Sequence, residues 1–350
     1  MATTSYGVNH PLAVKLWARK LFHDMIGMSY VGKFTGTSDK SLIQMKTETQ
    51  KGPGDKCTFG LRNLLTGAGI QGDAGLEGNE EALVTYNDAV VIDLLRHAVR
   101  SAGRMSEQRV PFSVREEARM GLQDWWIERL ETSVANQLTG NTGQADTRYT
   151  GNQATIAPSS GRIIVGGGET AEGSLSAVTT HAIKLADLDK AVAIAKVQTP
   201  RIRPIRVDGK DMWVAFLHPY QIYQLRRDAS TAGNFYDVQK AMLQGGKISD
   251  NPIVTGASFV YNNVLVHEWD YLPLVPSQTV YRRGVFCGAQ AAVCAYGQDN
   301  STNKMTWEEE LFDYGNQLGV AAGAIFGVKK AVFNSVDFGT IVLSGYAPAP

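Results

Sequence analysis

A single long helix constrains the fold of this 350-residue chain more than any other sequence feature. Ser113 and Glu116 have the spacing of a capping box at its start, and Gly140 is placed to end it. Between them, apolar residues recur at every fourth position: Ala118, Leu122, Trp126, Leu130, Val134 and Leu138. About 26 helical residues, at a rise of about 1.5 Å each, give a helix roughly 39 Å long. A helix of this length is unusual in a globular domain, and we interpret it as a structural strut.

Two extended stretches precede this helix and predict a long two-stranded ribbon. The first begins at Lys56, and the second runs from about Leu83 to Met105. Five glycines punctuate the segment between them, and so dense a set disfavours a helix and indicates turns or a flexible loop. They are Gly67, Gly69, Gly72, Gly75 and Gly78. We therefore expect the ribbon to end in a glycine-rich loop.

Charge is distributed unevenly along the predicted ribbon. Its glycine-rich end carries an acidic cluster made of Asp73, Glu77, Glu80 and Glu81. Its return limb carries Arg96, Arg100 and Arg104, which share one face of a strand because residues of equal parity point the same way. The residues between them, such as His97 and Val99, form the opposite face.

These charges have two interpretations. One is a solvated charged face; the other is that the acidic end of one subunit docks against the arginines of a neighbour and so sets register and orientation. The same arginines could instead contact phosphates without sequence specificity. Partner contact is favoured, since a long ribbon cannot bury both its faces within its own subunit. The candidate subunit-interface residues are Asp73, Glu77, Glu80, Glu81, Arg96, Arg100, Arg104 and Arg109.

The rest of the chain predicts an α+β fold with long strands late in the sequence. Residues 141–180 are rich in Gly, Ser, Thr, Asn and Gln and predict a loop, with no function of its own assigned to it. Helices are expected over 185–197, 218–225 and 235–243. Strands are expected over 201–207, 212–217, 264–268, 284–296, 319–333 and 339–346.

Composition excludes several classes of protein. Lys and Arg number 34, as do Asp and Glu, so the formal net charge of +0 excludes a generally basic nucleic-acid binder. Charged residues make up only 19% of the chain and glycines number 36, which suggests a surface largely used by partners. The three scattered cysteines favour a reducing compartment. The N-terminus lacks a signal peptide and the apolar run over 318–328 is too short to span a bilayer, so no membrane partner is expected.

Known catalytic motifs are missing or out of context. Gly67, Gly69 and Gly72 form a literal GxGxxG, but Asp73 and further glycines follow where a dinucleotide site needs a helix. The six histidines form no HExxH pattern, and neither GxSxG nor a P-loop occurs. We expect no catalytic residue, no cofactor and no metal. A catalytic set assembled from distant Ser, His and Asp residues is the alternative left open, and the Trp125–Trp126 pair predicts packing more than a ligand stack.

Several segments resemble one group of tailed-bacteriophage major capsid proteins. They are Gly54–Arg62, Gly72–Glu81, Leu95–Arg109, Trp125–Leu130, Phe216–Pro219 and Asn251–Gly256. The chain resembles the N-four-type podophage coat protein family, whose members take the Hong Kong 97 (Johnson) capsid fold. The resemblance implies an N-terminal arm over 1–50, an E-loop over 51–112 and a peripheral domain over 113–207. That domain would hold the spine helix 113–140 and the glycine-rich loop 141–180. The axial domain would be 208–300, and residues 301–350 would be return strands of the peripheral domain.

The resemblance also implies a function. Some capsid proteins carry a cleaved N-terminal scaffolding segment, but this chain has only a short arm, so we expect no such cleavage. Many copies would form hexamers and pentamers that close an icosahedral head shell around double-stranded DNA. The shell would be assembled in the host bacterial cytoplasm and become part of the virion. Portal, scaffold or decoration proteins are further partners, and DNA contact would be non-specific. The alternatives are an encapsulin-like compartment shell or, less favoured, a glycine-rich α+β enzyme or tail protein.

Overall fold

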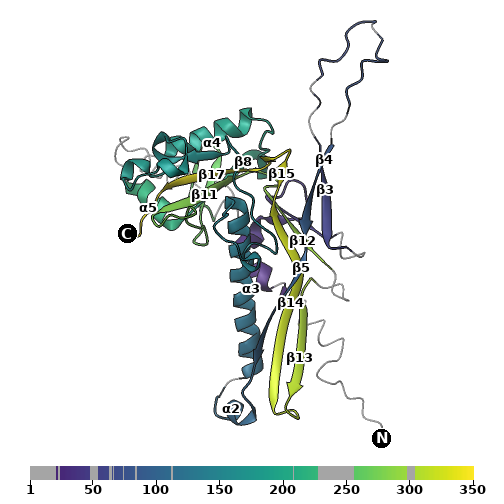
Figure 1. Ribbon diagram of the computed structural model, residues 1–350, viewed down its shortest axis with the longest axis vertical. Helices are drawn as coiled ribbons and strands as arrows, with labels where there is room; N and C mark the ends of the chain where they lie inside the picture. The colour runs from purple at the N-terminus through teal and green to yellow at the C-terminus, as the bar shows by residue number, and fades with distance from the viewer. Residues whose placement is uncertain are drawn as a thin grey trace.

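A computed structural model shows an elongated molecule built along one helix, α3 (Val114–Thr139) (Figure 1). It describes residues 21–22, 24–47, 54–62, 65, 67–73, 75–82, 85–111, 113–207, 209–227, 256–297 and 304–350. A lobe lies at one end of α3, and a two-stranded ribbon ending in a loop projects beside it (Figure 1). The helix expected over 235–243 lies outside the described residues, as do the first 20 residues.

The strut helix is confirmed with the predicted bounds. Gly140 ends it in the left-handed conformation, with φ of 60°, and the predicted apolar stripe is buried throughout. The predicted capping box is wrong: Ser113 occupies the N-cap position, but its side chain makes no capping hydrogen bond. The Ser113 carbonyl oxygen instead accepts the N–H groups of Glu116 and Glu117.

The first sheet runs along α3 and is centred on β14 (Gln317–Lys330). β5 (Asp93–Arg100) pairs with one edge of β14. β13 (Thr306–Phe312) and β12 (Ala292–Tyr296) pair with the other edge, one after the other. β2 (Ile43–Lys46) and β1 (Thr35–Gly36) extend the sheet beyond β12. One face of this sheet packs on α3, because alternate residues of β14 share a core with the apolar stripe of the helix.

The second sheet forms the lobe. Its strand order is β6 (Ile163–Val165), β17 (Thr340–Tyr346), β11 (Tyr281–Cys287), β8 (Lys210–Leu217), β10 (Val264–Glu268) and β9 (Phe259–Tyr261), with β7 (Ile205–Val207) paired to β8. α4 (Leu185–Val197) shares the core of this sheet and matches the predicted helix, and α5 (Pro219–Arg227) follows β8. The predicted strand over 264–268 is also confirmed.

Two predicted strands in the last third of the chain divide differently. The stretch 284–296 is two strands, β11 and β12, which lie in different sheets. Gln290, with φ of 57°, turns the backbone between them. The stretch 319–333 is β14 followed by the short β15 (Val332–Phe333), which pairs with β16 (Val336–Asp337). The last strand, β17, lies in the lobe, so residues 301–350 do not form one unit along α3.

The ribbon is shorter than predicted. β3 (Lys56–Arg62) pairs with β4 (Thr85–Val91), but the chain then leaves the ribbon, and β5 pairs with β14 instead. This pairing gives β5 a packed side, because His97 stacks on Trp125 of α3 with ring centroids 4.5 Å apart. Gly103, with φ of 138°, then ends the extended segment, and Arg104 begins a short helix, α2 (Arg104–Gln108).

The segment 141–180, expected to be a loop, is partly ordered into short elements. It holds β6 and four short 3-10 helices: η3 (Thr147–Tyr149), η4 (Gly166–Gly168), η5 (Glu172–Ser174) and η6 (Thr179–His181). A fifth, η1 (Val31–Phe34), precedes β1.

Candidate subunit interface

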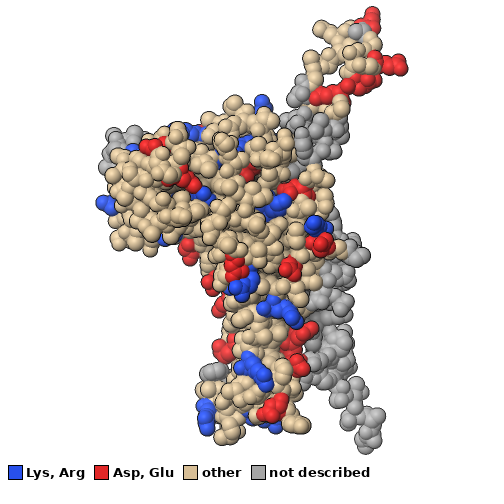
Figure 2. Space-filling view, in the orientation of Figure 1, with Lys and Arg blue, Asp and Glu red and all other residues tan. Residues whose placement is uncertain are grey.

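The acidic tip, defined as residues 67–82, projects beyond the body of the molecule (Figure 1). All four predicted acidic residues are exposed on it, and Figure 2 shows them as a red cluster. Two of them fold the loop on itself: Glu81 accepts the Gly67 N–H at 2.7 Å, and Glu80 accepts the Gly78 N–H at 2.8 Å. Asp73 and Glu77 remain for contacts outside the loop.

The acidic tip also exposes apolar surface. Leu76 on the tip is 65% exposed and Leu65 at its base is 63% exposed. A projecting loop that offers leucines and carboxylates together has the composition of a contact surface rather than that of a solvated turn.

Arg96 and Arg100 lie on the outer face of the first sheet, the face that points away from α3. Since His97 packs on the helix, the even-numbered side chains of β5 point outward, and Arg96 and Arg100 share one face of the strand as predicted. Two glycines of β14 make room for them. A Cβ at Gly323 would lie 2.9 Å from the Arg96 Cγ, so the arginine stem lies directly over this glycine.

An aromatic ring packs over the second glycine, Gly319. A Cβ at Gly319 would lie 2.7 Å from the Phe312 ring, and the Arg100 guanidinium stacks on that ring 4.2 Å from its centroid. Packing an aromatic ring over a strand glycine restores the cover that the missing side chain would provide. The guanidinium groups of Arg96 and Arg100 are thus held on the sheet and remain exposed.

Arg104 and Arg109 lie farther along, at the two ends of α2, and both are exposed. The prediction that Arg104 shares a strand face with Arg96 and Arg100 is wrong, because Arg104 is helical. Its backbone N–H bonds to the side chain of Asn316 in the turn between β13 and β14. Tyr314 in the same turn is fully exposed, so this end of the molecule combines cationic and aromatic groups.

The acidic tip and α2, which carries Arg104 and is followed by Arg109, lie at opposite ends of the long axis, and we call the surface formed by Arg96, Arg100, Arg104 and Arg109 the arginine end (Figures 1 and 2). One copy of the chain therefore cannot bring its own opposite charges together. Any direct pairing of these charges has to join separate copies.

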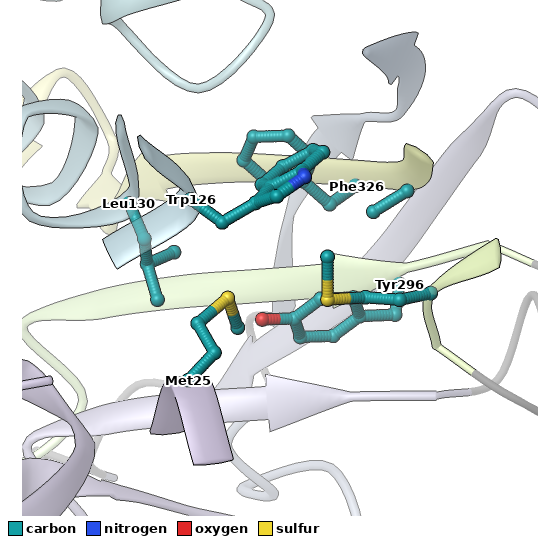
Figure 3. Close-up of a pocket in the computed structure, with 7 residues that line it drawn as sticks. Met25, Trp126, Leu130, Tyr296 and Phe326 are labelled. Carbon is teal, nitrogen blue, oxygen red and sulfur yellow. The ribbon is translucent and has the colours of Figure 1, made fainter. Parts of the chain in front are cut away.

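One small cavity lies in the described part of the core (Figure 3). That cavity lies between Met25, α3, β12 and β14, and Trp126 and Tyr296 line it. Its volume of about 10 Å³ holds a single water molecule at most.

Cys287, Cys294 and His267 belong to the core. Burial raises the pKa of the Cys287 thiol above its usual range and that of Cys294 to about 11, so both thiols are neutral at pH 7. His267 is buried, with its Nδ1 2.8 Å from the Tyr30 hydroxyl.

The glycine motif at Gly67 lies in the acidic tip, as the sequence predicted, and no helix opens there. None of the helices in the described ranges is long and apolar enough to cross a lipid bilayer.

Comparison with known proteins identifies the family. Residues 4–349 match the family described as phage capsid protein. The chain belongs to this phage capsid family. The major capsid protein of Pseudomonas phage KPP25 is 26% identical to it over 366 aligned positions, which cover 93% of each chain.

Solved capsids confirm the fold of this capsid protein. The capsid of Ralstonia phage GP4 aligns with a TM-score of 0.81 at 32% identity, covering 100% of this chain and 99% of that one. The capsid of cyanophage Pam1 aligns with a TM-score of 0.71 at 20% identity, covering 100% and 95%. The predicted Hong Kong 97-like α+β capsid fold is therefore correct. The SrpI encapsulin of Synechococcus elongatus shares the fold more distantly, with a TM-score of 0.50 at 11% identity over 98% of this chain and 91% of that chain.

The structure of this capsid protein also reveals charged residues that the sequence did not single out. Glu308 and Glu310 of β13 are exposed on the outer face, across β14 from the arginines. Glu309 between them points to α3, where Arg115 pairs with it at 2.7 Å. The alternation could have been found in the sequence, because the apolar Trp307 indicates which parity is buried.

Proposed function

We propose that this capsid protein is the major subunit of the icosahedral head shell of a tailed double-stranded DNA bacteriophage. Copies assemble with one another as hexamers and pentamers, in the host cytoplasm, and the shell becomes part of the virion. The family supports a capsid role, and one geometric observation supports the mode of assembly: complementary charges lie at opposite ends of each subunit.

The acidic tip of one copy docks against the arginine end of a neighbour in this proposal. Its subunit-interface residues are those of the acidic cluster together with Arg96, Arg100, Arg104 and Arg109. Each exposed ion pair contributes only about 0.5 kcal/mol, but every subunit engages several neighbours at once, so small terms accumulate.

The glutamates of β13 restrict how the tip approaches. A loop with four carboxylates is repelled by Glu308 and Glu310, so it lies on the β5 side of the outer face. Repulsion of the wrong approach supplies orientation in addition to the attraction that supplies affinity.

Other partners follow from the same role. Packaged DNA contacts the shell through sequence-independent electrostatics. Portal, scaffold or decoration proteins complete the particle. The subunit itself catalyses no reaction. In this proposal residues 1–50 are the arm, 51–112 the E-loop, 113–207 and 301–350 the peripheral domain and 208–300 the axial domain, and β17 crosses from the peripheral domain to pair with β11 of the axial domain.

Electron microscopy of the purified full-length chain tests this function. We expect closed particles, and particles recovered from infected cells should contain double-stranded DNA. A chain that stays monomeric under virion-like conditions would contradict the proposal. Particles that hold protein cargo and no DNA would favour the encapsulin-like alternative, for which the distant fold similarity is the supporting observation.

A further inference from the structure

The ribbon meets the first sheet at a junction, residues 91–93, where β4 ends and β5 begins. A turn that follows α3 binds this junction from the side. Asn152 in that turn donates its side-chain N–H groups to the Asp93 carbonyl oxygen at 3.2 Å and to the Phe326 carbonyl oxygen at 2.8 Å. One amide group thus joins the start of β5 to β14.

Gln153 makes the equivalent bridge one residue later. Its side-chain oxygen accepts the Val91 N–H at 3.4 Å, and its side-chain nitrogen donates to the Val328 carbonyl oxygen at 2.6 Å. The last residue of the ribbon is therefore linked to β14 through this side chain. Together the two amides hold both sides of the junction.

The same turn is fixed to the end of the spine helix. The Gln137 side chain donates to the carbonyl oxygens of Thr150 at 2.6 Å and of Gln153 at 3.2 Å. Gly151, with φ of 71°, presses the turn onto β14, since a Cβ there would lie 2.6 Å from the Val328 Cβ. The turn consequently has packed partners on both sides and little freedom to move alone.

We propose that Asn152 and Gln153 are positioning residues that fix the direction of the ribbon relative to α3. A two-stranded ribbon is only marginally stable by itself, so its direction is set at its base. Apolar packing of Cys57, Phe59 and Val90 and the Asp88–Lys329 ion pair anchor that base, and the two amides add hydrogen bonds at the junction itself. The inference deepens the proposed function, because the ribbon carries the acidic tip.

The backbone of the turn indicates which variants to use. Asn152 has φ of 63°, a conformation that glycine adopts readily, so Asn152→Gly removes the amide and leaves the turn unstrained. Gln153→Ala removes the second bridge. Asn263→Gly is the matched control, because Asn263 has φ of 60° but is exposed in the turn between β9 and β10. Each variant is made alone and the first two are also combined.

Distance measurement between spin labels tests the direction of the ribbon. One label is attached at Asn87→Cys on β4 and the other at Met120→Cys on α3, because both positions are exposed. The three native cysteines are buried. In the unassembled full-length chain we expect Asn152→Gly and Gln153→Ala to broaden the distance distribution, and the combined variant to broaden it most. Asn263→Gly should leave it unchanged.

Hydrogen exchange separates positioning from general stability. The Val91 amide should exchange about tenfold faster in Gln153→Ala, the factor expected for the loss of one net hydrogen bond. In Asn152→Gly, which loses a bond to the Asp93 carbonyl oxygen, the amides of residues 91–93 should exchange faster through local opening, while α3 keeps its protection. An unchanged distance distribution, or faster exchange spread equally over α3, would overturn the proposal. A broadened distribution with normal particle formation would support the positioning role and count against docking through the tip.

Discussion

Charge reversal on the outer face gives the sharpest test of tip docking. Changing Arg96 and Arg100 to Glu replaces two attractions by two repulsions. Because an exposed ion pair contributes about 0.5 kcal/mol, each reversal costs about 1 kcal/mol and the pair about 2 kcal/mol per contact. That loss corresponds to about a thirtyfold weaker association. Both side chains are exposed, so the chain should still fold, although the reversal removes the stacking of Arg100 on Phe312.

The assay measures the protein concentration at which particles appear, using light scattering and electron microscopy. Circular dichroism checks that each variant is folded. Arg201→Glu on the lobe is the matched control, because Arg201 is also exposed. Reversal of Asp73 and Glu77 to Arg in the same chain should restore assembly, since these two carboxylates do not fold the tip. Particle formation at the wild-type concentration by the reversed-arginine variant, or no rescue by the reversed tip, would refute tip docking.

Three further predictions concern the stability of the subunit. Burial lowers the pKa of His218 to about 4, from 6.5 in the unfolded chain. The unfolded state therefore binds more protons between these values, and the free energy of unfolding should fall by up to about 3 kcal/mol as pH drops from 6.5 to 4. Protonation would also break the bond from the Tyr220 N–H to His218 Nδ1, and denaturant titrations of His218→Asn should show a weaker pH dependence. Trp126→Ala should lower the free energy of unfolding by about 3–5 kcal/mol, because the indole fills the core under α3; a loss below about 1 kcal/mol would contradict this packing. Asp337→Ala should lower the free energy of unfolding by about 3–5 kcal/mol in the same titration, because it leaves the fully buried Lys330 without its counterion. In the wild type the Lys330 Nζ lies 2.7 Å from the Asp337 Oδ1. An unchanged midpoint would show that the pair contributes nothing.

Elements with a strong local pattern could be predicted from the sequence. The apolar residues of α3 keep one spacing over the whole helix, so local information sets both its bounds and its buried face. The acidic tip was predictable for the opposite reason, since its glycines exclude regular structure. Both features depend only on neighbouring residues.

Strand boundaries and partners could not be predicted, because they depend on distant pairing. β11 and β12 are both almost wholly buried, so they read as one apolar run without a visible break. The end of the ribbon at Ile92 carries no turn signal, and it is set by the pairing of β5 with β14 far along the chain. The prediction that Arg96 and Arg100 share one face of β5 was still correct, because the alternation of side chains along a strand is a local property.

The contacts of Asn152 and Gln153 were equally hidden. Both residues lie in a polar segment whose composition predicts only a loop. Their partners are backbone groups of β4, β5 and β14, which have no signature in the sequence. Residues that act on backbone atoms of distant strands can be found only once the fold is known.

The positions of tip and arginines bear on how a shell could close. Contacts between different surfaces on two copies are heterologous, and such contacts form a ring only when the rotation between copies closes on itself. In the proposed assembly this rotation depends on the angle at which the ribbon leaves the body. Rings of five and six copies differ by a small rotation per contact, so the same interface must tolerate a small range of ribbon angles while excluding larger ones. The ribbon and its base together provide both properties: the tip glycines allow local adjustment, whereas the bridges of Asn152 and Gln153 to β14 limit the swing at the base. Loosening these bridges should therefore give irregular shells rather than no shells, whereas charge reversal at Arg96 and Arg100 should give fewer shells of normal form.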